Sequence, residues 1–71
     1  MERLNNVWKF VEFVAEDVTL MRRLVPEVTD FEVEISTRCP VGTRLVEARP
    51  GDEFSVAAPG GDVWVLVVGI R

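Results

Sequence analysis

Residues 39–56 read Cys-Pro-Val-Gly-Thr-Arg-Leu-Val-Glu-Ala-Arg-Pro-Gly-Asp-Glu-Phe-Ser-Val, and they predict a helix, a turn and a strand in succession. Proline is favoured at the first helical position, so we expect a short helix over residues 40–47 with Cys39 as a buried or half-buried residue at its cap. Pro50-Gly51-Asp52 has the composition of a turn. The alternation of apolar and polar residues that follows predicts a strand over residues 53–58.

Downstream of this stretch, Pro59-Gly60-Gly61-Asp62 indicates a hairpin turn. Residues 63–70 are almost free of polar side chains, which is typical of a central strand covered on both faces. Gly69 suggests a bulge or a close contact near the end of that strand.

Upstream, residues 31–36 alternate strictly, with Phe31, Val33 and Ile35 on one face and polar residues on the other. This pattern predicts a half-buried antiparallel strand. Residues 27–30 have the character of a connection.

Residues 4–25 have apolar positions spaced as on one face of an amphipathic helix. We expect either one helix or a pair, with Asp17 capping a second helix over residues 18–24 and Pro26 ending it. Phe10 and Phe13 lie off the stripe, and residues 7–14 are rich in strand formers, so a strand remains the alternative there.

The sequence thus predicts one α+β domain over residues 1–71, helical in residues 1–25 and β-rich in residues 31–71. An N-terminal helix or helix pair would pack on a small antiparallel sheet of three to four strands, with one short intervening helix. The residues expected in the core between sheet and helix are Val33, Ile35, Phe54, Val65 and Val67.

Composition argues against most enzyme classes. The 71 residues include no histidine and a single cysteine, Cys39, which leaves no His-based acid–base pair, no internal disulfide and no cysteine cluster for a metal. Glu32 and Glu34 share a strand face but provide too few ligands for a divalent ion. We therefore expect no enzymatic activity, no cofactor and no metal site.

The net charge of −4 has the wrong sign for a nucleic-acid binder, so we expect no direct contact with nucleic acid. Arginine supplies nearly all the positive charge, which mildly favours a protein partner. The longest apolar run is too short to cross a bilayer, and no secretory signal is recognisable. We expect a cytoplasmic protein without membrane contact.

Residues 31–71 resemble the C-terminal domain of Gre-type transcript cleavage factors, a domain shared with the regulators of nucleoside diphosphate kinase. The family pattern runs Ser-Pro-Leu-Gly, a short helix, Gly-Asp-Glu-Val, Pro-Gly-Gly and a closing strand. The matching positions are Pro40, Gly42, Leu45, Gly51, Asp52, Glu53, Pro59, Gly60 and Gly61. The resemblance implies an FKBP-like antiparallel sheet with one helix, which docks on bacterial RNA polymerase beside its secondary channel.

The departures from the family limit what the resemblance implies. The long N-terminal coiled coil, whose acidic tip holds magnesium for RNA cleavage, has no counterpart, so transcript cleavage is not expected. The family's docking patch includes an Asp-Ser-Pro, which here is Arg38, Cys39 and Pro40. Only Pro40 is retained, and Arg38 reverses a charge.

These observations predict a small non-enzymatic protein that binds bacterial RNA polymerase at Arg38, Cys39 and Pro40 and modulates transcription. The alternative is a general protein-interaction module, an inhibitor or a small subunit of an assembly, unrelated to the polymerase.

Overall fold

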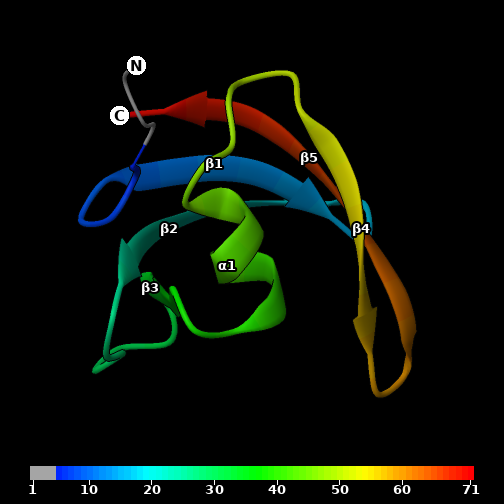
Figure 1. Cartoon of the computed structure of the whole chain (residues 1–71), viewed down its shortest axis with the longest axis horizontal. Helices are drawn as coiled ribbons and strands as arrows, with labels where there is room; N and C mark the ends of the chain where they lie inside the picture. The colour runs from blue at the N-terminus through cyan, green and yellow to red at the C-terminus, as the bar shows by residue number, and fades with distance from the viewer. Residues whose placement is uncertain (1–4) are drawn as a thin grey trace.

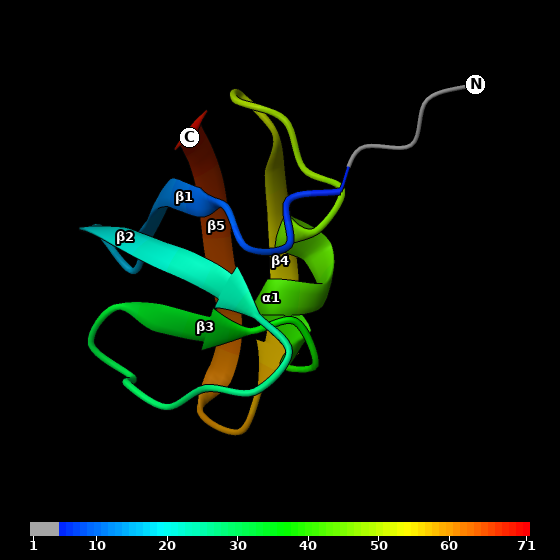
Figure 2. The same cartoon turned by 90° about the vertical axis from the view of Figure 1, so that its left-hand side faces the viewer.

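The computed structural model describes residues 5–71, which form one curled five-stranded sheet around one short helix (Figure 1). The elements are β1 (Phe10–Ala15), β2 (Val18–Val25), β3 (Glu34–Ser36), α1 (Pro40–Leu45), β4 (Glu53–Ala58) and β5 (Gly61–Ile70). The strand order is β3-β2-β1-β5-β4. Figure 2 shows β2 and β3 running in the same direction beside the helix, and the other neighbouring strands are antiparallel.

The predicted N-terminal helix or helix pair is wrong, because its residues form the β1–β2 hairpin. Glu16 and Asp17 both have positive φ, 51° and 64°, and make the two-residue turn whose twist suits a hairpin. Val11 and Phe13 point into the core from alternate positions of β1. The valines and phenylalanines of this segment fit a helical period as well as a strand, and the pairing of β1 with the distant strand β5 decides between the two.

The predicted sheet is also wrong in size and in one pairing direction. The observed sheet has five strands, and β2 pairs with β3 in parallel, with Leu24 opposite Ile35. No helix in residues 5–71 is long and apolar enough to span a membrane.

The expected strand over residues 31–36 forms only at its end, over Glu34–Ser36. The carbonyl of Asp30 accepts hydrogen bonds from the N–H groups of Val33 and Glu34, at 3.2 and 2.9 Å, so the chain turns before it joins the sheet. Phe31 is 81% exposed and Val33 is 47% exposed. The core position predicted for Val33 is therefore wrong, whereas Ile35 packs at the edge of the core.

The predictions for the C-terminal part are largely confirmed. The helix begins at Pro40 as expected, β4 has the expected bounds, and Ala58 pairs with Gly61 across a two-residue turn. A bulge lies beside Gly69, since Glu12 pairs with Gly69 while the next residue pairs with Val67. The expectation that β5 is covered on both faces is wrong, because Trp64 is 44% exposed on the convex face.

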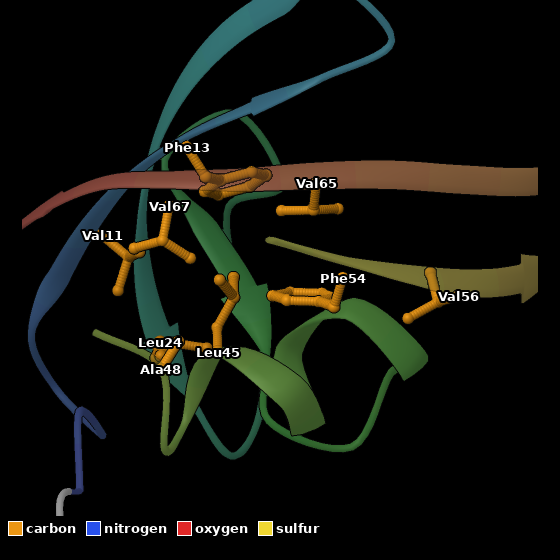
Figure 3. Packing of buried hydrophobic residues seen from close by; sticks show 9 residues of the cluster. All are labelled: Val11, Phe13, Leu24, Leu45, Ala48, Phe54, Val56, Val65 and Val67. Carbon is orange, nitrogen blue, oxygen red and sulfur yellow. The ribbon is translucent and has the colours of Figure 1, made fainter. Parts of the chain in front are cut away.

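The core lies between the concave face of the sheet and α1, as Figure 3 shows. The predictions for Phe54, Val65 and Val67 are confirmed. Leu45 of α1 and Ala48 in the loop after the helix also belong to this core. The complete buried cluster is Val11, Phe13, Leu24, Leu45, Ala48, Phe54, Val56, Val65 and Val67.

Asn6 attaches the helix to the N-terminal side of the sheet. It is the one buried polar side chain found in residues 5–71, at 3% exposed. Its Nδ2 donates to the carbonyl oxygens of Leu45 and Ala48, at 2.8 and 3.0 Å. Its backbone N–H donates to the Val46 carbonyl at 3.0 Å. Asn6 therefore satisfies carbonyl groups that the end of a helix leaves without partners.

Candidate partner-binding site

The corner between β3 and α1 carries the three residues predicted to bind a partner. Ser36 fixes its path: the Ser36 carbonyl accepts from the Cys39 N–H at 3.3 Å, and the Ser36 Oγ accepts from the Arg38 N–H at 3.0 Å. Arg38 and Pro40 are exposed and Cys39 is half-buried. The corner thus presents a guanidinium and a proline ring to solvent, and their role in binding stays a prediction.

Cys39 is the N-cap of α1, as the sequence predicts. Its Sγ accepts from the N–H of Gly42 at 3.2 Å, and its carbonyl accepts from the N–H and the hydroxyl of Thr43, both at 2.9 Å. The Thr43 hydroxyl also contacts the Thr37 carbonyl at 3.0 Å. These bonds fix the thiol and the carbonyl of Cys39 at the start of the helix.

Gly42 allows the helix to approach β3 closely. A Cβ atom at this position would collide with the backbone carbonyl oxygen of Ser36 and would lie 3.2 Å from the Cys39 sulfur. A main-chain carbonyl cannot move aside as a flexible side chain can. Glycine is therefore required at this point of the sequence pattern, and it positions the corner.

An apolar groove of about 340 Å³ opens beside the corner on the concave side of the sheet. It lies between β1, β2, β3 and the start of α1. Phe31 forms part of its wall, and Cys39 connects it to the corner. The lining residues are Phe13, Ala15, Leu20, Arg22, Phe31, Glu34, Ile35, Ser36, Cys39 and Val41.

The two charged side chains of the groove are each held by nearby backbone groups. Arg22 Nη1 donates to the Met21 carbonyl at 2.9 Å. Glu34 Oε1 accepts from the backbone N–H groups of Thr29 and Asp30, at 2.9 and 3.1 Å, and from the Thr29 hydroxyl at 3.1 Å. These bonds stabilise the carboxylate and so lower the pKa of Glu34 from its ordinary value, with the larger effect from the Thr29 N–H and the next from the Asp30 N–H.

The hydrogen bonds of Glu34 decide whether Arg38 is paired within the chain or free to bind a partner. If Arg38 paired with Glu34, its charge would be neutralised within the chain. Glu34 instead binds the loop before β3, and within residues 5–71 the Arg38 guanidinium makes no ion pair or hydrogen bond. Arg38 is therefore available to a carboxylate of another molecule.

The groove and the exposed ring of Phe31 are features that the sequence pattern did not predict, because the alternation places Phe31 on the same strand face as Val33 and Ile35. The signal was the residue before it: the Asp30 carboxylate accepts from the Glu32 N–H at 3.0 Å, a turn that aspartate favours. Such a turn excludes Phe31 from the strand and leaves its ring exposed.

A second hollow, of about 240 Å³, lies on the other side of α1 and is more polar. Its walls include Glu47, Asp52 and Phe54, and the Arg44 guanidinium lies 4.7 Å from the centre of the Phe54 ring. No three acidic or thiol side chains in residues 5–71 converge so that they could hold a metal ion.

Comparison with known proteins finds similarity to the Gre factors. No protein-family model matches the chain. A 45-residue segment, 63% of the chain, is 38% identical to transcription elongation factor GreA of Geobacillus kaustophilus and covers 28% of that protein. The crystal structure of GreA factor homolog 1 (Gfh1) of Thermus thermophilus aligns with 99% of the chain at a TM-score of 0.71 and 28% identity. The similarity to a C-terminal segment of the Gre factors is confirmed.

Two further Gre structures agree. Gfh1 of Thermus aquaticus covers 92% of the chain, with a TM-score of 0.73 and 27% identity. The GreA/GreB elongation factor of Nitrosomonas europaea covers all of it, with a TM-score of 0.71 and 26% identity. The similarity therefore extends beyond residues 31–71, where the sequence pattern alone located it. The chain spans 46% of the T. aquaticus structure, 49% of the T. thermophilus structure and 64% of the N. europaea structure.

Proposed function

We propose that this protein acts in the manner of a transcription elongation factor, by binding bacterial RNA polymerase and modulating transcription without cleaving the transcript. The similarity to Gre elongation factors supports a role of this type. The observation that carries the proposal is the apolar groove beside an exposed corner on a Gre-like domain.

The chemistry of the site fits a protein partner with an apolar side chain next to a carboxylate. Phe31 exposes most of its ring to water, and burying such a ring under a partner is strongly favourable. Arg38 is exposed at the corner, next in sequence to the groove residue Cys39, and its guanidinium is unpaired within residues 5–71. A partner segment that places an apolar residue in the groove and an acidic residue over the corner satisfies both.

The proposal includes no enzymatic step, no direct nucleic-acid contact and a cytoplasmic location. Its support is chemical. The sequence has no histidine, the one thiol caps a helix, and the net charge is −4. Under this proposal the protein acts on the polymerase by occupying a surface.

The test is the affinity of the protein for purified bacterial RNA polymerase. Phe31→Ala should weaken binding roughly tenfold or more, the size typical of a central aromatic contact. Val68→Ala, which shortens an exposed apolar side chain on the convex face, is the control and should leave the affinity unchanged.

The charge at the corner is tested separately. Arg38→Glu should weaken binding, and the loss should be larger at low salt because the interaction is between charges. Arg49→Glu makes the same charge change at another exposed position and controls for the net charge of the protein. A wild-type protein that does not bind the polymerase would refute the proposal. Tight binding that neither Phe31→Ala nor Arg38→Glu alters would move the interface away from this site.

A further inference from the structure

The outer edge of β4 is a second surface with the properties of an interface. β4 is the last strand in the sheet order, so it has a neighbour on one side only (Figure 1). Its six residues are Glu-Phe-Ser-Val-Ala-Ala. The strand at the opposite edge, β3, has only three residues. An open edge strand is a template for pairing with another chain.

The hydrogen bonds beside β4 identify which of its backbone groups are free. The N–H of Val67 donates to the Asp52 carbonyl at 2.9 Å, and the Val67 carbonyl accepts from the Gly51 N–H at 2.7 Å. Val67 therefore faces the β4 side, and so do the alternate residues of β5 that pair with Phe54 and Val56. The main-chain groups that point outward belong to Glu53, Ser55 and Ala57.

This edge lacks the devices by which proteins usually protect an edge strand. It contains no lysine, no proline and no bulge, and Pro59 comes only after its last residue. Ser55 and Ala57 are exposed and small, so they leave the backbone accessible. Glu53 is the single charged residue of the strand.

We propose that two copies of this chain pair through β4, antiparallel about a two-fold axis at Ser55, to form a continuous ten-stranded sheet. In this register Ser55 lies opposite its symmetry mate, and the three outward residues of each copy exchange about six hydrogen bonds. Phe54 of one copy lies opposite Val56 of the other on the concave face. Glu53 lies opposite Ala57 of the other copy.

Charge selects this arrangement among the pairings of two identical strands. In the antiparallel register the two Glu53 residues are about 14 Å apart, well beyond the screening length of about 8 Å in physiological salt. A parallel pairing in register would place them in adjacent strands, about 5 Å apart. A second copy thus meets the edge without opposing like charges.

Trp64 adds apolar surface beside the proposed interface, and a second copy would bring its own Trp64 to the other side of the two-fold axis. It lies opposite Ser55 in the β4–β5 pair, on the convex face, with 44% of its surface exposed. Across the two-fold axis the row would read Trp64, Ser55, Ser55, Trp64. Because serine is small, each indole can lean over the Ser55 of its own copy toward the two-fold axis and cover apolar surface there.

The first test is the mass of the wild-type protein by sedimentation equilibrium, from micromolar to millimolar concentration in physiological salt. We expect a dimer to form as the concentration rises. Ser55→Pro deletes an outward N–H without breaking the β4–β5 ladder, so it should give a folded monomer. Ser55→Thr keeps the N–H and should still dimerise.

The second test checks the register and does not depend on a proline. Ala57→Glu places like charges opposite Glu53 at both ends of the interface and should weaken the dimer roughly tenfold. Ala57→Lys makes the matched opposite change and should leave the dimer at least as stable as the wild type. A wild-type protein that stays monomeric over the whole range overturns the proposal. A dimer whose stability changes with neither Ser55→Pro nor Ala57→Glu also overturns the proposal, because its interface would then lie away from β4.

Discussion

Asn6→Ala should destabilise the fold far more than its position near the start of the described chain suggests. The mutation removes the Nδ2 donor from two carbonyl oxygens, those of Leu45 and Ala48. An unsatisfied buried acceptor costs about 1–3 kcal/mol. The Leu45 carbonyl keeps a bond from the Ala48 N–H at 3.3 Å, so we expect a total loss of about 2–3 kcal/mol. A domain of this size has a stability between about 4 and 10 kcal/mol, so the loss is a large fraction of it.

The measurement is urea unfolding followed by far-UV circular dichroism. With a denaturant dependence of about 1 kcal/mol per molar urea, the midpoint should fall by roughly 2 M. Asn5→Ala is the matched control. Asn5 is exposed, and its side chain accepts one bond from the Val7 N–H at 3.0 Å, so its loss should cost about 0.5 kcal/mol.

Asn6→Asp separates the lost hydrogen bonds from the lost volume. A carboxylate of nearly the same size would place a charged acceptor oxygen where Nδ2 donates to the two carbonyl oxygens, so this variant should be less stable than Asn6→Ala at neutral pH. Equal midpoints for Asn6→Ala and Asn5→Ala would refute the reasoning, since the two carbonyls would then find water without cost.

Three further predictions concern the core, the corner and the loop before β3. Gly42→Ala should cost at least about 2 kcal/mol in urea unfolding, because the added methyl collides with the Ser36 carbonyl; a wild-type midpoint would mean that α1 shifts freely. Phe54→Ala should cost about 3–5 kcal/mol, and a cooperative melt near the wild-type temperature would contradict its burial. The pKa of Glu34 is lowered in the folded state, so its contribution to stability is present above its ordinary value of 4.5 and is lost as the pH falls through the lower folded value. Glu34→Gln should flatten the pH dependence of stability in that window, and an unchanged slope would show that the bonds from Thr29 contribute nothing.

The C-terminal part of the fold follows from the sequence because its signals are local. Pro40 starts a helix, and the paired glycines near residue 60 start a hairpin, whatever the rest of the chain does. The N-terminal part does not follow in this way. Val11 and Phe13 fit both a helix and a strand, and the choice depends on β5, which pairs with β1 from the far end of the sequence.

The candidate site was predictable in part for the same reason. The corner at Arg38 to Pro40 lies where a strand passes into a helix, and both signals are local. The groove beside it is built from β1, β2, β3 and α1 together, so no single window of sequence contains it. Phe31 alternates correctly with Val33 and Ile35, and only the hydrogen bonds of Asp30 exclude it from the sheet.

The pairing of β1 with β5 has a consequence for how the chain reaches this structure. The β1–β2 and β4–β5 hairpins close short loops and can form early and independently. The two halves join only when β1 pairs with β5, which brings together residues as far apart in the sequence as Val11 and Ile70, and this pairing carries the largest cost in loop-closure entropy. Folding speed should therefore be set by the association of two preformed hairpins, and α1 has its full binding surface only after they have met.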